Sequence, residues 1–245
     1  MAMPGMTDIH SHILPGLDDG ARSWEVACEM VRMAHADGTR HMVATPHAND
    51  RYRYDRGYAL ELLATLSNDC GVEMRFSIGC DFHFSIENVE AALLEPHHFS
   101  IGMTDYLLVE FSDFGISPFT SDALLRILSR GITPIITHPE RNQILQRKPE
   151  MVLDFVKNGC LVQVTANSLS GFWGGTANKT AQWLLDREAV HVIASDAHDT
   201  KRRPPGLSGA HKWLKKHYSL EVADRLCIEN PLSVVENKAI MAVRD

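Results

Sequence analysis

The sequence predicts an α/β domain built on a mainly parallel sheet. Its 245 residues, 44% of them hydrophobic, suit one globular domain. Short apolar runs bounded by turn residues alternate with longer amphipathic segments, which is typical of repeated strand–helix units. Seven such units can close as a distorted barrel related to the eight-unit form, or remain open as a doubly wound sheet. Without a low-complexity linker or a repeat, one domain over residues 6–245 is the simplest account. Residues 1–5 (MAMPG) are expected to be a vector remnant or a disordered start.

The predicted strands are short runs rich in apolar and β-branched residues, and the last of them reads VHVIAS. The seven strands are expected at about 7–12, 41–46, 75–81, 106–111, 132–137, 161–165 and 190–195.

The predicted helices place apolar residues three and four positions apart. In the first, 24–37, Ser23 is a candidate N-cap and Gly38 ends the helix. Gly71 and Gly131 follow two further segments and are expected to form left-handed C-caps. The full set is expected at 24–37, 57–70, 119–130, 150–158, 176–187, 206–217, 220–229 and 232–243.

Composition argues against several classes of partner. With 24 Lys and Arg against 31 Asp and Glu, the formal charge is -7, and no basic block could coat a nucleic acid. No apolar run is long enough for a membrane span, and no secretory signal is evident. Five widely spaced cysteines suit thiols in a reducing compartment, with Cys28, Cys80 and Cys227 in the core. The expected location is therefore cytoplasmic.

Metal-capable side chains fall at the ends of six of the seven predicted strands, and only the strand at 161–165 brings none. In parallel α/β folds, the carboxyl ends of the strands meet at one edge. Residues two apart on a strand also point to one side, so His10 can converge with His12, and Asp196 with His198. The nine candidate ligands are His10, His12, Asp19, His47, Asp81, Glu110, His138, Asp196 and His198.

A mixed set of imidazoles and carboxylates suits manganese, iron or zinc better than calcium. Nine ligands exceed the needs of one ion and indicate two or three ions bridged by carboxylate. Such ions would make the site locally positive, which favours a phosphate dianion as substrate. Seven other histidines are expected to be ordinary surface or hydrogen-bonded residues: His35, His41, His97, His98, His191, His211 and His217.

Several competing chemistries lack their motifs in this chain. There is no Cys-x5-Arg for thiolate phosphatase chemistry, and no Gly-x4-Gly-Lys, Gly-x-Gly-x-x-Gly, Gly-x-Ser-x-Gly or His-Glu-x-x-His. Amidohydrolases also begin with His-x-His, but their binuclear members typically use a carboxylated lysine in mid-barrel. Here the first lysine is Lys148.

The ordered motifs resemble the polymerase and histidinol phosphatase (PHP) superfamily. Within it, the chain is similar to the bacterial metal-dependent protein-tyrosine phosphatases of capsule and exopolysaccharide loci. The likeness extends from Asp8 to Pro231. It is carried by DIHSHI at 8–13 with DDG at 18–20, TPH at 45–47, VEF at 109–111, ITHPER at 136–141, and IASDAH at 193–198 followed by RPP at 203–205.

The resemblance implies a TIM-barrel-like, distorted (β/α)7 barrel with three divalent ions, usually manganese, with iron, zinc or cobalt as alternatives. It also implies that Arg141 and Arg203 bind the phosphate. The family pattern usually has glutamate at position 81, where this chain has the shorter Asp81. The implied ligand sets are His10, His12, Asp81 and Asp196 for the first ion, Asp81, Glu110 and His138 for the second, and Asp19, His47 and His198 for the third.

The expected activity is hydrolysis of a phosphomonoester by a metal-bound hydroxide. The resemblance implies a phosphotyrosine protein as substrate, in particular the tyrosine-rich tail of a bacterial autokinase. Two alternatives stay open: a small-molecule phosphatase of the histidinol-phosphate type, and a non-catalytic, metal-stabilised binding module. An aromatic rim for a peptide is a further hypothesis, formed by Tyr52, Arg53, Tyr54, Phe172 and Trp173.

Overall fold

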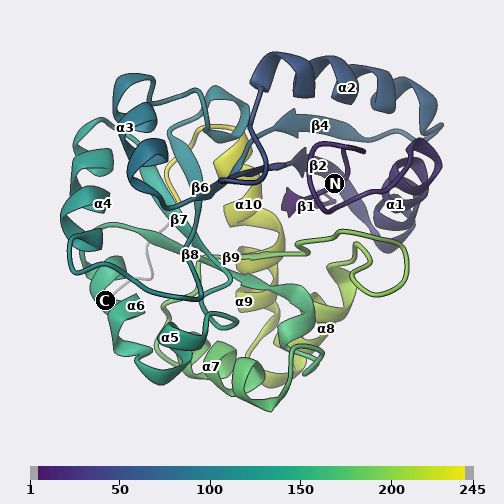
Figure 1. Cartoon of the computed structure of the whole chain (residues 1–245). Helices are drawn as coiled ribbons and strands as arrows, with labels where there is room; N and C mark the ends of the chain where they lie inside the picture. Colours follow the sequence, from purple (N-terminus) through teal and green to yellow (C-terminus); the bar gives the residue numbers. More distant parts are fainter. Residues whose placement is uncertain (1–4, 241–245) are drawn as a thin grey trace.

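The computed structural model describes residues 5–240, which fold as a parallel barrel with helices around it (Figure 1). Six strands form one sheet in the order β3-β5-β6-β7-β8-β9, and three form a second sheet in the order β1-β2-β4. The strands are β1 Met6–Ser11, β2 Thr39–Ala44, β3 His47–Ala48, β4 Arg75–Ile78, β5 Asp81–His83, β6 Tyr106–Glu110, β7 Thr133–Thr137, β8 Leu161–Thr165 and β9 Val192–Ala194. Their pairings are all parallel.

The second and third units of the barrel each contain a broken strand. The sequence predicts one continuous strand at 41–46 and another at 75–81. The prediction of a continuous strand at 75–81 is wrong, because β4 ends at Ile78 and β5 begins at Asp81. Pro46 similarly separates β2 from β3, because proline has no N–H to continue the ladder. The upstream halves pair in the three-stranded sheet and the downstream halves in the six-stranded sheet. These breaks are the distortion of the (β/α)7 barrel.

The barrel closes where β1 meets the end of β9. The Asp196 N–H donates to the carbonyl of His10 at 2.9 Å, and the His12 N–H donates to the carbonyl of Ala197 at 2.8 Å. An isolated parallel bridge joins Ser11 to Ala197. Of the two sheet arrangements compatible with the sequence, the structure therefore adopts the closed barrel and not the open doubly wound sheet.

Ten α-helices lie within the described range, and the predicted caps are confirmed. Ser23 accepts a hydrogen bond from the Val26 N–H at the start of the first helix, and Gly38 ends it with φ 105°. Gly71 and Gly131 also have positive φ, 66° and 83°. The helices are α1 Trp24–Asp37, α2 Arg56–Asp69, α3 Ile86–Leu94, α4 Thr120–Ser129, α5 Gln143–Arg147, α6 Glu150–Lys157, α7 Gly175–Leu185, α8 Ser208–His217, α9 Leu220–Asp224 and α10 Asn230–Val235.

The helix predictions are wrong at α3, at α5 and in the last helical segment of the chain. Helices α3 and α5 were not expected, since each is short and lacks a long apolar period. The segment 220–229 is helical as predicted, as α9 followed by the π-helical η3 at Arg225–Glu229, but α10 follows directly at Asn230, so the gap expected before residue 232 is absent. In the segment 232–243, α10 ends at Val235, and residues 241–245 lie outside the described part of the chain, as do residues 1–4.

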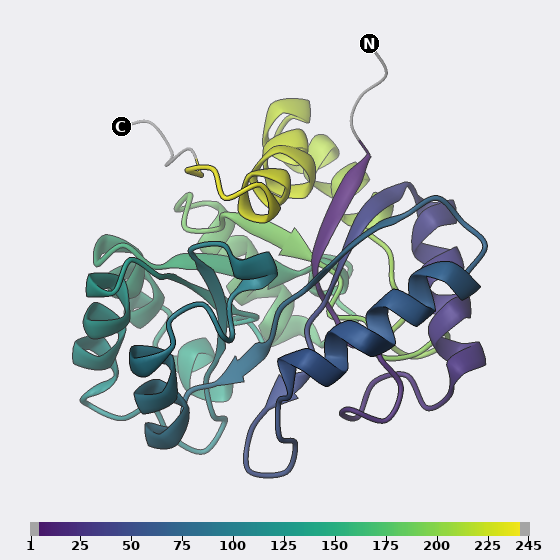
Figure 2. The ribbon, with the colours of Figure 1, turned by 90° about the horizontal axis from the view of Figure 1, so that it is seen from above.

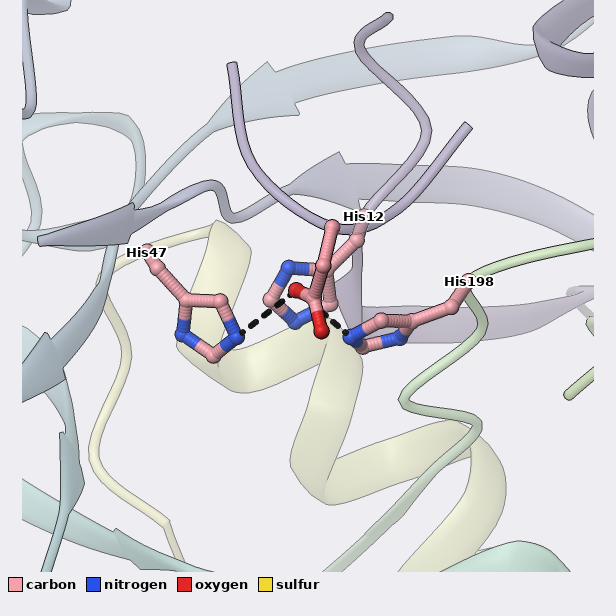
Figure 3. Close-up of side chains that lie close together, drawn as sticks. His12, His47 and His198 are labelled. Atoms are coloured by element: carbon pink, nitrogen blue, oxygen red, sulfur yellow. Dashed lines mark ion pairs between the residues drawn. The ribbon is translucent and has the colours of Figure 1, made fainter. Parts of the chain in front are cut away.

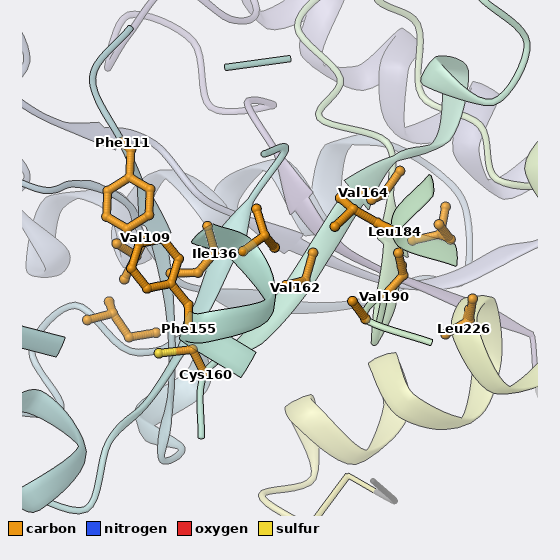
Figure 4. Packing of buried hydrophobic residues seen from close by; sticks show 14 of the residues in the cluster. Val109, Phe111, Ile136, Phe155, Cys160, Val162, Val164, Leu184, Val190 and Leu226 are labelled. Atoms are coloured by element: carbon orange, nitrogen blue, oxygen red, sulfur yellow. The ribbon is translucent and has the colours of Figure 1, made fainter. Parts of the chain in front are cut away.

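The hydrophobic core has one part inside the barrel and others between barrel and helices. Inside, Ile9, Leu108 and Val192 pack together, and Val234 of α10 belongs to the same cluster. Figure 2 shows the C-terminal helices (yellow) at the end of the barrel where β1 begins. Outside, valines and isoleucines of β6, β7 and β8 pack against helical residues such as Phe155 (Figure 4). The opposite end, where the strands finish, is left open to form a site.

The five cysteines are buried free thiols, and Cys28, Cys80 and Cys227 lie in the core as predicted. None of the helices in residues 5–240 is both long and apolar enough to cross a bilayer.

Candidate metal centre

The structure brings all nine predicted ligands together at the carboxyl ends of the strands. Their donor atoms form four overlapping groups, within each of which the atoms lie within 4.8 Å of one another. The groups are His12, Asp19, His47 and His198; His10, Asp81 and His138; His10, His12 and Asp196; and His47, Asp81 and Glu110. Sharing of residues between groups indicates one continuous cluster.

At one side of the cluster, three imidazoles surround the carboxylate of Asp19. His47 Nε2 lies 3.4 Å and His198 Nε2 lies 3.6 Å from Asp19 Oδ1. The rings of His12 and His198 are 3.9 Å apart between centroids. Figure 3 shows His12, His47 and His198 pointing toward one another from three different segments. This group matches the set implied for the third ion, with His12 added.

At the centre of the cluster, His10 lies between two buried carboxylates. Its Nε2 is 3.5 Å from Asp81 Oδ2 and 3.4 Å from Asp196 Oδ1. The same Asp81 oxygen is 3.2 Å from His47 Nδ1, so Asp81 joins two groups despite being shorter than glutamate. His10 and His12 converge as predicted, with their Nε2 atoms 3.2 Å apart.

Glu110 and His138 complete the cluster on the other side. His138 Nε2 lies 3.7 Å from Glu110 Oε1, and His47 Nδ1 lies 3.8 Å from Glu110 Oε2. His138 also falls in a group with His10 and Asp81. The arrangement therefore overlaps the implied ligand sets without dividing the residues among ions in the same way.

Two of the candidate ligands have unusual backbone conformations. His138 has φ 36° and Asp196 has φ 52°, in the left-handed region that residues other than glycine rarely adopt. Such strain concentrates at functional sites, where the surrounding structure maintains it. The position of Asp196 also differs from the strand position that the sequence predicts. Asp196 and His198 do converge, with Asp196 Oδ1 3.6 Å from His198 Nδ1, but both lie beyond the end of β9, so strand alternation is not the reason.

The electrostatics of the cluster favour cations. Burial lowers the pKa of His10, but Asp81 and Asp196 outweigh it and raise that pKa to about 9. Burial likewise opposes protonation of His47, yet its contacts with Asp19 and Asp81 raise its pKa to about 11. Burial raises the pKa of Asp81, but His10 and His47 outweigh it and hold that pKa well below its usual range. Buried carboxylates thus remain anionic and attract positive charge.

The donor set fits divalent metal ions. His47 Nδ1 and Asp81 Oδ2 are buried and lie 3.2 Å apart, but they do not have hydrogen-bonding geometry toward each other or toward any other described residue. Buried polar atoms without partners are costly, and a coordinated cation would satisfy them. Imidazole nitrogens mixed with carboxylate oxygens are the ligands preferred by manganese, iron and zinc.

Two residues that were not among the predicted ligands contact the Nδ1 atoms of His12 and His10. Asp18 Oδ2 lies 2.7 Å from His12 Nδ1, and Gln163 Oε1 lies 2.9 Å from His10 Nδ1. Such partners fix the tautomer of a ligating histidine and leave its other nitrogen for the metal. Asp18 was visible as half of an Asp-Asp pair, whereas Gln163 was recognisable only as a polar residue inside an otherwise apolar strand.

Arg141 and Arg203, the predicted phosphate-binding residues, lie beside the cluster. Both guanidinium groups contact Oδ2 of Asp196, whose other oxygen faces the histidines. Burial raises the pKa of Asp196, but Arg141, His10 and Arg203 together lower it well below its usual value. Two fixed cations thus border the candidate metal ligands.

Two of the hollows that open onto the cluster share Glu110 in their linings. One, of about 180 Å³, is lined by Glu110, His138, Arg141 and Trp173. The other, of about 440 Å³, is lined mainly by Asp19, His47, Asn49, Asp50, Arg51, Tyr52, His83, Glu110, Phe111, Ser112, Asp113 and Phe114. Candidate ligands are therefore accessible from both, and a third hollow, of about 230 Å³, is lined in part by Asp19 and His198.

The predicted aromatic rim is only partly present. Tyr52 lines the larger hollow and Trp173 the smaller one, whereas Phe172 is exposed. The assignment of Tyr54 to the rim is wrong, because Tyr54 is buried against Phe99.

The histidines expected to be ordinary lie outside the four groups. Three are clear examples of hydrogen-bonded residues: His41 with Ser77, His191 with the Val162 N–H, and His211 with Asp224.

Comparison with known proteins places this site in a family. The family model described as "Capsular polysaccharide synthesis, CpsB/CapC" matches residues 6–236. The tyrosine-protein phosphatase YwqE of Bacillus subtilis is 30% identical, over 96% of this chain and 93% of its own. The tyrosine-protein phosphatase CpsB of Streptococcus pneumoniae is 28% identical, over 96% of this chain and 100% of its own.

Solved structures give the same result. A structure from the study of YwqE and CpsB, described as unique metal-dependent tyrosine phosphatases, superposes with a TM-score of 0.88 at 30% identity and covers 98% of this chain and 100% of that chain. The phosphotriesterase homology protein of Escherichia coli superposes with a TM-score of 0.61 at 13% identity, covering 96% of this chain and 100% of that chain, and shares the fold.

Proposed function

Because the chain belongs to the CpsB/CapC family of capsular polysaccharide synthesis proteins, we propose that it is a metal-dependent protein-tyrosine phosphatase. The observation that carries the proposal is the gathering of nine imidazole and carboxylate side chains, from six units of the barrel, beside two arginines. The relatives with this fold and similar sequence bear the names of tyrosine phosphatases.

We propose that the cluster holds three divalent ions, with manganese as the first choice and iron, zinc or cobalt as alternatives. The buried donor atoms of His47 and Asp81, which lie close together without a hydrogen bond, support binding at the shared centre, and the group around Asp19 supports a further ion at the rim. Ions of this kind make bound water more acidic and stabilise negative charge on phosphoryl oxygens.

The residues of the chain would bind and orient the phosphate. The guanidinium groups of Arg141 and Arg203 lie at the edge of the ligand cluster, and guanidinium forks match the geometry of phosphate oxygens. Arg203 Nε is buried and has no partner among the described residues, so a donor remains for an incoming anion. Gln163 and Asp18 would keep His10 and His12 in fixed tautomers during turnover.

For the substrate we propose a phosphotyrosine protein, in particular the tyrosine-rich tail of a bacterial tyrosine autokinase. The larger hollow beside the cluster is lined by Tyr52, Phe111 and Phe114, and Phe114 is fully exposed, so a phenyl ring has apolar partners there. Because protein kinases use cytoplasmic ATP, we also propose that this protein is located in the cytoplasm.

The test measures metal content and hydrolysis on one preparation. The purified protein should release phosphate from an aryl phosphate and from a phosphotyrosine peptide, lose both activities on chelation, and regain them with manganese. A panel that includes phosphoserine peptide and histidinol phosphate checks the substrate class. Preference for histidinol phosphate would favour the small-molecule alternative, and inactivity with metals bound would favour a non-catalytic binding module.

A further inference from the structure

The loop that follows β8 carries an indole that lies against both arginines. Arg141 Cζ is 3.9 Å and Arg203 Cζ is 5.3 Å from the centroid of the Trp173 ring. Strand β8 belongs to the one strand–helix unit that supplies none of the nine candidate ligands, so its loop contributes to the site in a different way.

The indole itself is held in place. Trp173 Nε1–H donates to Asn167 Oδ1 at 2.6 Å, and Phe172 packs edge-on against the ring at 5.2 Å between centroids. Gly171 and Gly174 flank these aromatics with φ 83° and 89°, and the Gly174 N–H donates to the Gly171 carbonyl. The tight turn fixes the ring before any ligand arrives.

Two adjacent guanidinium groups need such a partner. Like charges repel, and among the described residues the only carboxylate oxygen that both arginines contact is Oδ2 of Asp196. The other oxygen of Asp196 faces His10 and His12, the side on which a metal would bind. The face of an aromatic ring attracts cations without competing for the hydrogen-bonding edges of the forks.

We propose that Trp173 is a positioning residue that holds Arg141 and Arg203 side by side for the phosphate group. This inference rests on the proposed function, because it assumes that the two arginines receive the phosphate. Trp173 acts through the arginines: it keeps their planes against one fixed surface while their N–H groups turn from Asp196 to an anion. The guanidinium groups of Arg141 and Arg203 are then already ordered before the phosphate binds, which lowers the entropic cost of binding.

The test compares Trp173→Ala with Trp173→Phe in the metal-loaded full chain. Loss of the ring should raise KM for an aryl phosphate and the inhibition constant of inorganic phosphate about tenfold each, the effect of a desolvated cation–π contact. Metal content should not change. Trp173→Phe keeps an aromatic face and should restore both constants to within about threefold of the wild-type values.

A matched control is available elsewhere in the chain. Arg187 Cζ also lies 3.9 Å from the ring centroid of Trp183, away from the ligand cluster. Trp183→Ala should therefore leave KM and the phosphate inhibition constant unchanged even if it lowers the melting temperature. This control separates loss of an indole in general from loss of the arginine platform.

A second readout does not require turnover. Binding of inorganic phosphate near Trp173 should change the tryptophan fluorescence of the wild type, and this change should vanish in Trp173→Phe while phosphate still inhibits. If Trp173→Ala binds phosphate and substrate as the wild type does, the positioning role is wrong while the proposed function stands. If the metal-loaded wild type hydrolyses no phosphate ester, both fail together.

Discussion

Gln163 Oε1 lies 2.9 Å from Nδ1 of His10, although the two residues are 153 positions apart. This contact leaves Nε2 of His10 facing Asp81 and Asp196. A neutral imidazole that donates from one nitrogen can ligate only through the other, so Gln163 determines which atom of His10 faces the candidate ions.

Replacement of Gln163 by leucine should therefore weaken metal binding without unfolding the barrel. We expect the affinity for manganese to fall about 10- to 100-fold, the usual effect of losing a hydrogen-bond partner of a ligating histidine. Titration of the metal-free protein with manganese, followed by calorimetry, measures this change. Gln163→Glu retains an acceptor and serves as the control. Equal affinity in Gln163→Leu and the wild type would mean that the contact has no role in metal binding.

His138→Ala and Arg141→Ala should separate metal binding from phosphate binding. Both variants should lose at least about 100-fold in kcat/KM, because each removes a charged or ligating contact at the site. Metal analysis should show a reduced metal content only for His138→Ala. Arg187→Ala, which removes an exposed arginine far from the cluster, is the control. Normal turnover by Arg141→Ala would contradict its proposed role.

Removal of metal should also lower the stability of the fold. Four carboxylates belong to the overlapping groups of donor atoms: Asp19, Asp81, Glu110 and Asp196. Without cations their negative charges repel one another. A ligand present at about 100 times its Kd stabilises the native state by about 2.7 kcal/mol, which is worth about 5–10 °C in a domain of this size. Differential scanning calorimetry with manganese and with chelator gives the difference. A melting temperature that does not respond to chelation would show that the cluster holds no strongly bound ion.

Acid should destabilise the protein partly through His191, which is far from the metal centre. Burial lowers the pKa of His191 to about 4, and its Nδ1 accepts a hydrogen bond from the Val162 N–H at 3.1 Å. The unfolded chain binds this proton near the usual pKa of about 6.5, whereas the folded chain does not. The stabilising contribution of His191 to the free energy of unfolding is therefore present above pH 6.5. It is lost as the pH falls toward 4, and the loss amounts to about 3 kcal/mol.

The variant His191→Asn tests that linkage. Asparagine retains a side-chain acceptor for the Val162 N–H but does not titrate. Urea unfolding of both proteins between pH 7 and pH 4.5 should give a shallower loss of the free energy of unfolding in the variant. All other titrating groups are common to both proteins and cancel in the difference. Parallel curves would show that His191 titrates alike in the folded and unfolded chains.

The sequence by itself determined the seven strand–helix units, most of their caps and the nature of the donor set. These features are local: apolar periodicity selects strand or helix, and glycine at Gly38 or Gly131 ends a helix because it tolerates positive φ. The placement of ligand types at strand ends was readable for the same reason, since the ends of parallel strands share one edge whatever the details of packing.

Only the tertiary structure decided how those residues meet. Closure between β1 and the segment after β9, the break after β4, and the left-handed backbone of His138 and Asp196 depend on contacts between distant segments. The partners Gln163 and Trp173 belong to a strand and loop without a candidate ligand, so no local pattern connected them to the site. Periodicity records which face of an element is buried, but not which distant side chain lies against it.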